Sequence, residues 1–224
     1  MNFRRVLQTI LIPTLIVTGS VLLKAEEKAT NKVNAPSVNT NSWQSLFDGK
    51  TLAGWKVTNF GGAGEVHAEK GEIKLDMGGE LTGISWTNGG LPTVDYEVEL
   101  DAMKIDGNDF FCGLTFPVKQ KFCSLIVGGW GGTVIGLSSI DGMDASENDT
   151  TKSRYLERNK WFHIRVRVEA EKIQMWLGDE QLIDVTTKDR KVGLRAGDIE
   201  LSQPLGIATW QTSAALKNLR LRKL

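Results

Sequence analysis

The stretch Val94-Asp95-Tyr96-Glu97-Val98-Glu99-Leu100-Asp101-Ala102 alternates apolar and acidic residues without a break. A second stretch, Phe162-His163-Ile164-Arg165-Val166-Arg167-Val168, alternates apolar and basic residues in the same way. Successive side chains of a β-strand point to opposite faces, so each stretch predicts a strand with one buried and one solvated face. If the two strands are neighbours, acids and bases would pair across the sheet and fix its register rather than form a functional site.

The same period of two recurs through most of the chain. Residues 173–177 and 181–185 flank Gly178-Asp179-Glu180 and predict a hairpin, and residues 110–116 and 122–127 predict another. Turn-forming clusters separate the strands, and no segment after the N-terminal stretch has a convincing helical period. About a dozen short strands in a chain of this length predict an all-β sandwich or barrel.

The only two cysteines, Cys112 and Cys123, fall in the second of these hairpins. With a loop of even length both sulfurs would point to one face, together with Phe110 and Phe116. A two-residue loop at Pro117-Val118 would place the cysteines opposite each other and within reach of a disulfide, whereas a four-residue loop would leave them diagonal. Two buried thiols that pack as small hydrophobic groups are the other reading.

The N-terminus predicts export from the cytoplasm. Arg4 and Arg5 precede a mostly apolar run from Val6 to Leu23, as in a secretory signal peptide, so residues 1–25 are expected to be removed or to remain as an N-terminal anchor. Residues 26–41 are polar and read as a flexible linker, and residues 42–224 form the single domain. Periplasm, cell surface and extracellular medium are the expected locations, with membrane contact only through an uncleaved N-terminus.

The charge of the mature part argues against polyanionic partners. Residues 1–25 hold three bases and no acid, so the remainder has 24 basic against 27 acidic residues and a formal charge of about −3. Nucleic acids and anionic membranes need clustered cations, which this balance does not favour. No nucleotide-binding loop or G-x-S-x-G nucleophile motif occurs, and His67 and His163 are too far apart in the sequence to suggest a zinc site.

The opening of the domain, Ser45-Leu46-Phe47-Asp48-Gly49-Lys50-Thr51-Leu52-Ala53-Gly54-Trp55-Lys56, resembles the start of the 3-keto-disaccharide hydrolase domain family. Weaker matches follow in the family's order, at residues 69–73, 96–100, 160–162, 176–179 and 219–221. The resemblance covers residues 42–224. It implies a concanavalin/laminin-G-like jelly-roll β-sandwich, export, and action on sugars oxidised at carbon 3.

The chemistry implied by this resemblance is elimination. A ketone acidifies the neighbouring C–H bond, so the glycosidic bond can break before water adds, given a base, an acid and a cation near the enolate. Typical members supply Arg, Glu and Asp from two central strands. In this chain the matching stretches, residues 109–116 and 122–130, lack all three family residues, so none of those assignments transfers.

The first candidate site is Gly128-Gly129-Trp130-Gly131-Gly132. Glycines such as Gly129 and Gly131 let a backbone approach a ligand closely, and the Trp130 ring can stack on the apolar face of a sugar. A tight turn with a packed aromatic is the alternative. Trp86 is a further candidate for a sugar-binding surface, although tryptophan in a sandwich more often belongs to the core.

The second candidate is the oxygen-rich loop from Asp141 to Asp149. Paired carboxylates are the common solution for glycosidic acid–base chemistry, and Asp109, Asp144 and Glu147 are the predicted catalytic residues, with Asn148 a substrate-binding candidate. The same loop would suit Ca²⁺, although it lacks EF-hand spacing and no cofactor is otherwise indicated. A solvated surface loop is the third reading.

These observations favour an exported carbohydrate-active domain that hydrolyses or eliminates glycosidic bonds of 3-keto-glycosides. The alternative is a non-catalytic, lectin-like carbohydrate-binding module at the cell surface, which would keep the jelly roll without cleft acids. A structural surface domain is the third hypothesis.

Overall fold

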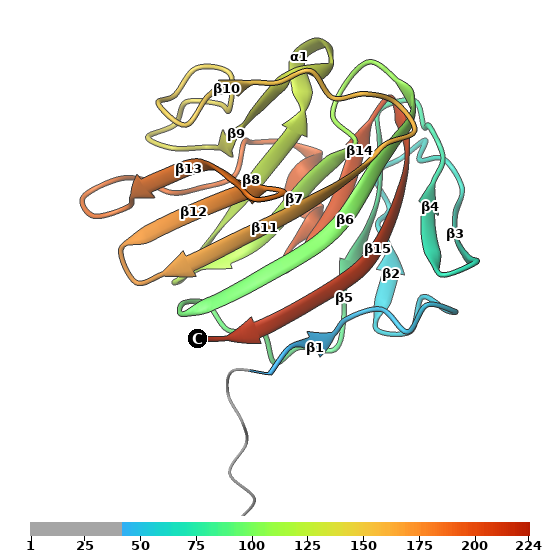
Figure 1. Cartoon of the computed structure of the whole chain (residues 1–224), viewed down its shortest axis with the longest axis horizontal. Helices are drawn as coiled ribbons and strands as arrows, with labels where there is room; N and C mark the ends of the chain where they lie inside the picture. Colours follow the sequence, from blue (N-terminus) through green and yellow to red (C-terminus); the bar gives the residue numbers. More distant parts are fainter. Residues whose placement is uncertain (1–41) are drawn as a thin grey trace, which may run out of the picture. The chain divides into compact units, whose positions relative to one another are not determined.

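A computed structural model describes residues 42–224, which form two antiparallel β-sheets packed face to face (Figure 1). The predicted all-β sandwich is confirmed. No helix within these residues is long and apolar enough to cross a membrane. The predicted signal peptide and linker lie outside the described residues.

Sheet A has the strand order β13-β12-β11-β6-β15-β4-β3, with β1 paired to β15. Its strands are β1 (Gln44–Ser45), β3 (Val66–Glu69), β4 (Glu72–Leu75), β6 (Tyr96–Gly107), β11 (Trp161–Glu169), β12 (Lys172–Leu177), β13 (Glu180–Thr186) and β15 (Thr212–Lys223).

Sheet B has the order β10-β9-β8-β7-β14-β5-β2. Its strands are β2 (Trp55–Val57), β5 (Leu81–Trp86), β7 (Cys112–Val118), β8 (Lys121–Gly128), β9 (Val134–Ser138), β10 (Lys152–Ser153) and β14 (Gly206–Trp210). A four-residue turn labelled α1 (Gly129–Gly132) joins β8 to β9, and a short 3-10 helix, η1 (Asp198–Ser202), precedes β14.

The core lies between the sheets and is built from the apolar half of each alternating strand. Val98 and Leu100 of β6 and Ile164 and Val166 of β11 are buried in one hydrophobic cluster, as their strict alternation predicts. Leu125 of β8 reaches the same cluster from sheet B. Burial of this shared apolar surface is the main force that holds the two sheets together.

The predicted pairing of charges across sheet A is confirmed. Strand β11 pairs with β6 in a register that places Arg167 opposite Glu97, and β15 places Arg222 opposite Glu97 on the other side. Arg167 Nε donates to Glu97 Oε1 at 2.8 Å and Arg222 Nε donates to Oε2 at 2.7 Å. Burial alone would raise the pKa of Glu97, but hydrogen bonds and charge from the two arginines outweigh it and hold the pKa below its ordinary 4.5.

The hairpin of β7 and β8 settles the two open questions about its cysteines. Val118 pairs with Lys121, so the loop is Lys119-Gln120, and Cys112 lies opposite Val127 instead of Cys123. Both cysteines are free and buried, and burial raises the pKa of each thiol to about 12. At neutral pH they are therefore protonated and unreactive.

One residue of this hairpin departs from the expected alternation. Phe110 was expected to share a face with Cys112, but it lies before β7 begins and packs outside the main core, against Leu81 and Ala208. Its neighbour Phe111 is fully buried in the core instead. The prediction for Phe110 is therefore wrong, because strict alternation does not extend past the end of the strand.

Small residues on the outer face of sheet B let covering segments approach the sheet closely. A Cβ added to Gly136 of β9 would lie 2.6 Å from the carbonyl oxygen of Ala145. A Cβ on Gly206 of β14 would clash with the backbone of Ser202 in η1. Covering segments can therefore lie directly on the sheet at these points, and η1 also lines the space described next.

Candidate functional site

A cavity of about 490 Å³, which we call the cleft, lies on the outer face of sheet B beside the α1 turn. Its lining residues come from six chain segments and are Glu80, Leu81, Asp109, Phe110, Ser124, Ile126, Trp130, Ser138, Arg195, Ala196, Gly197, Asp198, Ile199 and Trp210. Its size is in the usual range for small-molecule sites, and it combines apolar walls with a few polar groups, as such sites commonly do.

The sheet supplies the floor of the cleft. Ser124 and Ile126 alternate with the core residues of β8 and therefore point outward, and Ser138 ends β9 beside them. The ring of Phe110 lies over Gly113, where an added Cβ would come within 2.9 Å of it. A small apolar cluster outside the main core consists of Phe60, Leu81 and Ala208. Three partly buried residues pack against it and make one wall of the cleft apolar, namely Phe110, Ile199 and Trp210.

The α1 turn carries Trp130 into the lining of the cleft. Figure 1 shows this turn between β8 and β9. Gly128 and Gly131 both have positive φ, at 87° and 86°, and Trp130 itself has φ 48° and ψ 60°. This left-handed conformation is costly for a bulky residue and persists only where the surroundings impose it. The Trp130 side chain remains 40% exposed, so its ring is available to a ligand.

Asp109 lies next to this turn and lines the cleft from the start of the β7 segment. Its Oδ1 accepts a hydrogen bond from the Phe110 backbone N–H at 2.8 Å, and its own N–H donates to Thr212 Oγ1 at 3.2 Å. A Cβ on Gly129 would lie 3.8 Å from Asp109 Oδ1, so the turn passes close to the carboxylate. The structure therefore brings together two predicted segments, Asp109 and Gly128–Gly132.

Arg195 supplies a cation to the cleft from the segment between β13 and η1. Its Nη1 is 3.1 Å from Asp144 Oδ2, and the other oxygen, Oδ1, accepts a hydrogen bond from Ser138 Oγ at 3.0 Å. Asp144 thus holds the guanidinium beside the floor of the cleft. Sequence reasoning missed Arg195, Glu80 and Asp198, because isolated charged residues in turns carry no pattern that links them.

The rest of the acidic loop is braced rather than directed into the cleft. Arg190 binds Asp141 through Nε at 2.8 Å and Asp149 through Nη1 at 2.7 Å. A backbone hydrogen bond from Lys191 and the pairing with Arg190 lower the pKa of Asp141. Asn148 is buried, and its Nδ2 donates to the carbonyl oxygens of Leu137, Met143 and Asp144.

Glu147, by contrast, is exposed and does not line the cleft. Of the four acids in the loop, Asp141, Asp144 and Asp149 are each paired with an arginine. Within the described residues, this loop is therefore built as a support for its neighbours.

Three other residues considered from the sequence are not in the lining of the cleft. Trp86 is 8% exposed and packs edge-on against Trp55, with ring centroids 5.1 Å apart. Gly131 is exposed at the α1 turn. His67, on β3 of sheet A, has potential ligand atoms within 4.8 Å of those of Glu65 and Asp76, and its side chain is 39% exposed.

A family model for the 3-keto-alpha-glucoside-1,2-lyase-like domain matches residues 42–222. The chain belongs to this family. The chain is therefore a carbohydrate-active β-sandwich domain. The resemblance drawn from the opening segment is thereby confirmed. No curated protein matches the sequence.

Two solved structures illustrate how widely the fold is shared. The apo Crh5 transglycosylase is similar with a TM-score of 0.56 at 12% identity, over 82% of this chain and 84% of that chain. A putative glycosyl hydrolase from Parabacteroides distasonis ATCC 8503 has a TM-score of 0.50 at 14% identity, over 81% of this chain and 94% of that chain. At such low identity these likenesses show the fold alone.

Proposed function

We propose that the domain cleaves glycosidic bonds of 3-keto-glycosides by elimination, with water added afterwards when the net reaction is hydrolysis. The observation that carries the proposal is the cleft, where the half-buried Asp109 and the braced Arg195 share one cavity with the Trp130 ring. Membership of the family supports the same substrate class. The cleft thus offers a base and a cation, and Asp198 and Glu80 in its lining are the candidate acids.

In the proposed reaction Asp109 takes the proton from carbon 2, next to the ketone. The electron pair of that C–H bond forms an enolate, which Arg195 stabilises by its charge. The enolate then expels the oxygen at carbon 1, which leaves a double bond between carbons 1 and 2. Asp198 or Glu80, at the rim of the cleft, protonates the leaving oxygen.

Trp130 would bind the sugar without taking part in proton transfer. Its exposed ring offers a flat apolar surface, and aromatic rings stack on the apolar faces of sugar rings. Loss of the ring should therefore weaken binding, whereas loss of Asp109 should slow the chemical step. This contrast separates an enzyme from a binding module.

A lectin-like module remains the second candidate, and one observation favours it. The Arg, Glu and Asp that typical family members carry in their central strands are missing here. A domain that kept Trp130 and the apolar wall but lost productive acid–base geometry would bind glycans without turnover.

The test is release of products from 3-keto and ordinary disaccharides by the purified domain, with and without Ca²⁺. Asp109→Asn should lower turnover by roughly two to four powers of ten and leave binding nearly intact. Trp130→Ala should weaken binding by roughly tenfold. Binding that depends on Trp130, with no turnover in any form, would establish the lectin-like reading. Neither turnover nor binding would leave only the structural reading.

We also propose that the domain acts outside the cytoplasm. Arg4 and Arg5 before an apolar run support removal of about the first 25 residues during export. Sequencing the N-terminus of the protein from the cell envelope and the medium tests this. Recovery of Met1 would exclude cleavage and favour the membrane anchor, and recovery from the cytoplasm would exclude export.

A further inference from the structure

A second cavity, of about 740 Å³, lies on the outer side of the β7–β8 hairpin and is called the groove. The hairpin turn contributes Lys119 and Lys121 to it, and the segment after β13 contributes Thr187 and Lys191. Glu200 is the only acidic residue in its lining. The groove is therefore basic, whereas the described part of the protein as a whole is not.

The three lysines of the groove have no salt-bridge partner. No carboxylate oxygen lies within 4.0 Å of the Nζ atom of Lys119, Lys121 or Lys191 in residues 42–224. Arg190 also lines the groove, but Asp141 and Asp149 bind its guanidinium. The available positive charge thus comes from the lysines, which approach the groove from two separate segments.

Thr187 adds a polar group that lacks a partner. Thr187 as a whole is 8% exposed, and its Oγ1 atom is buried and has no hydrogen-bond partner. A buried hydroxyl without a partner is costly, and the great majority of such groups in proteins are satisfied. Because Oγ1 is closed to solvent in the free domain, a ligand oxygen would accept a hydrogen bond from it only after the Thr187 side chain turns toward the groove.

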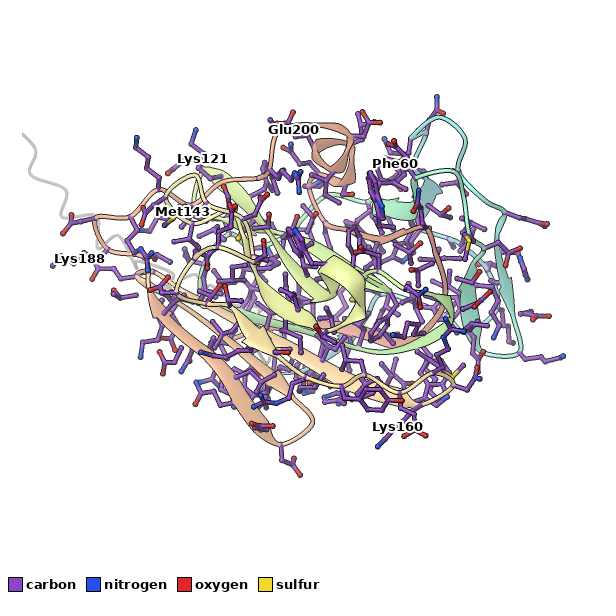
Figure 2. The ribbon with its side chains drawn as sticks, turned by 90° about the horizontal axis from the view of Figure 1, so that it is seen from above. Phe60, Lys121, Met143, Lys160, Lys188 and Glu200 are labelled. Atoms are coloured by element: carbon purple, nitrogen blue, oxygen red, sulfur yellow. The ribbon has the colours of Figure 1, made fainter. Side chains whose placement is uncertain are left out.

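The groove and the cleft are adjoining sites on the same side of the molecule. Leu194 lines the groove and Arg195 lines the cleft, while in η1 Asp198 faces the cleft and Glu200 the groove. Lys121 and Glu200 lie along the side that also holds Phe60, opposite Lys160 (Figure 2). A chain molecule held in the cleft could therefore continue into the groove.

We infer that the groove binds the acidic groups, carboxylate or sulfate, of a glycan chain. Lysine ammonium groups attract such anions, and three of them without a salt-bridge partner concentrate the field in a concave site. That the anion belongs to a glycan rests on the proposed function, since the cleft next to the groove is where the sugar would lie. The preference for negative charge rests on the groove alone.

The experiment compares a trisaccharide of galacturonic acid with a neutral trisaccharide of galactose by calorimetric titration of the domain. The acidic ligand should bind more tightly, and added salt should weaken it. The variant K119Q/K121Q/K191Q should lose about tenfold or more in affinity for it. The matched control K50Q/K56Q/K223Q removes the same charge from exposed sites elsewhere and should keep wild-type affinity.

Thr187→Val separates a ligand-binding role from a structural one. Loss of the unpartnered hydroxyl should raise the melting temperature of the free domain and still weaken the acidic ligand several-fold. A merely structural residue would not move these two measurements in opposite directions.

Equal affinity for the acidic and neutral ligands, or an unchanged affinity in the groove variant, would overturn the inference. So would groove-dependent binding to phosphatidylglycerol vesicles without binding of the acidic trisaccharide, because the anion source would then be a membrane. Charge-selective binding in a domain without turnover would count against the proposed function only. Turnover on 3-keto sugars without charge selectivity would count against the groove only.

Discussion

The outer faces of the two sheets differ in how their charges are used. On sheet A, Glu97 lies between Arg167 and Arg222, and Glu99 binds Arg220 in the same way. On sheet B, the cleft places Asp109 and Asp198 in its lining without a salt bridge to either in the described residues. Both faces are polar, but the ladder carboxylates are paired, whereas the two carboxylates of the cleft remain available to a ligand.

This difference distinguishes charged residues that fix the strand register from charged residues that serve a ligand site. Charges that pair along a strand ladder satisfy one another and fix which residues face each other. Charges that meet in a hollow without satisfying one another are maintained at a cost and point to a ligand. Four experiments test this distinction.

The largest expected effect on stability is that of Glu97→Ala. Glu97 is fully buried, and its loss would leave Arg167 and Arg222 facing each other without their shared partner. Breaking such a buried network should lower the free energy of unfolding by about 3–5 kcal/mol, measured by urea denaturation. Asp179→Ala, in an exposed turn, is the control and should stay within about 0.5 kcal/mol of wild type. A mild effect of Glu97→Ala would mean that the ladder is dispensable.

The second effect concerns activity rather than stability. Arg195→Met should reduce the turnover number by roughly a hundredfold, because it removes the charge that stabilises the enolate. Asp144→Asn should reduce it less and shift its pH profile, because Asp144 positions Arg195 and does not touch the substrate. Arg154→Met, which breaks a surface pair with Glu180, is the control. If Arg195→Met raises KM alone, the arginine only binds the substrate.

The third effect is acid sensitivity, and it should be smaller than that of Glu97→Ala. The pKa of Glu97 is lower in the folded state than the ordinary 4.5, so its stabilising contribution is present above that value and is lost as the pH falls through the folded pKa. Thermal unfolding measured between neutral and acidic pH should show this loss. Arg222→Gln should flatten the dependence, and an unchanged slope in that variant would assign the acid sensitivity to other groups.

The smallest effect tests the strained turn. Trp130→Gly removes a side chain from a residue with φ 48°, so the variant should be more stable than Trp130→Ala by about 0.5–1 kcal/mol. Both variants should lose the same binding energy, because both lack the ring. Chemical denaturation and glycan titration measure the two quantities. A Gly variant less stable than the Ala variant would show that the turn is not strained.

Most of the fold was predictable, because the alternation of apolar and polar residues along a strand indicates which side chains face the core. The pairing of Arg167 with Glu97 followed from two such strands and their opposite charges. Phe110 was misplaced because it lies just before its strand begins, where alternation no longer holds. The loop of the cysteine hairpin was left open because turn length does not follow from alternation.

Less of the site could be predicted. Asp109 and the Trp130 turn were candidates, and the structure places both in the cleft. Asp144 was expected to act on a proton but binds Arg195, and Asn148 and Trp86 are held by internal contacts. Arg195 and Asp198 come from loops that reach the cleft only through the packing of distant segments. No local pattern could have linked them to Asp109.

Gly136 and Gly206 lie on strands whose alternate residues have two different roles. Ile135 and Ile207, their neighbours, build the interior, whereas these two positions only set how closely a loop may approach the sheet. A single methyl group at Gly136 would meet the backbone of Ala145 and push its covering loop away from the sheet, whereas one at Gly206 would also meet the backbone oxygen of Ile84 in the sheet itself. The position of the loop that holds Asp144 can therefore be changed at Gly136 without a change in the side chains of the interior.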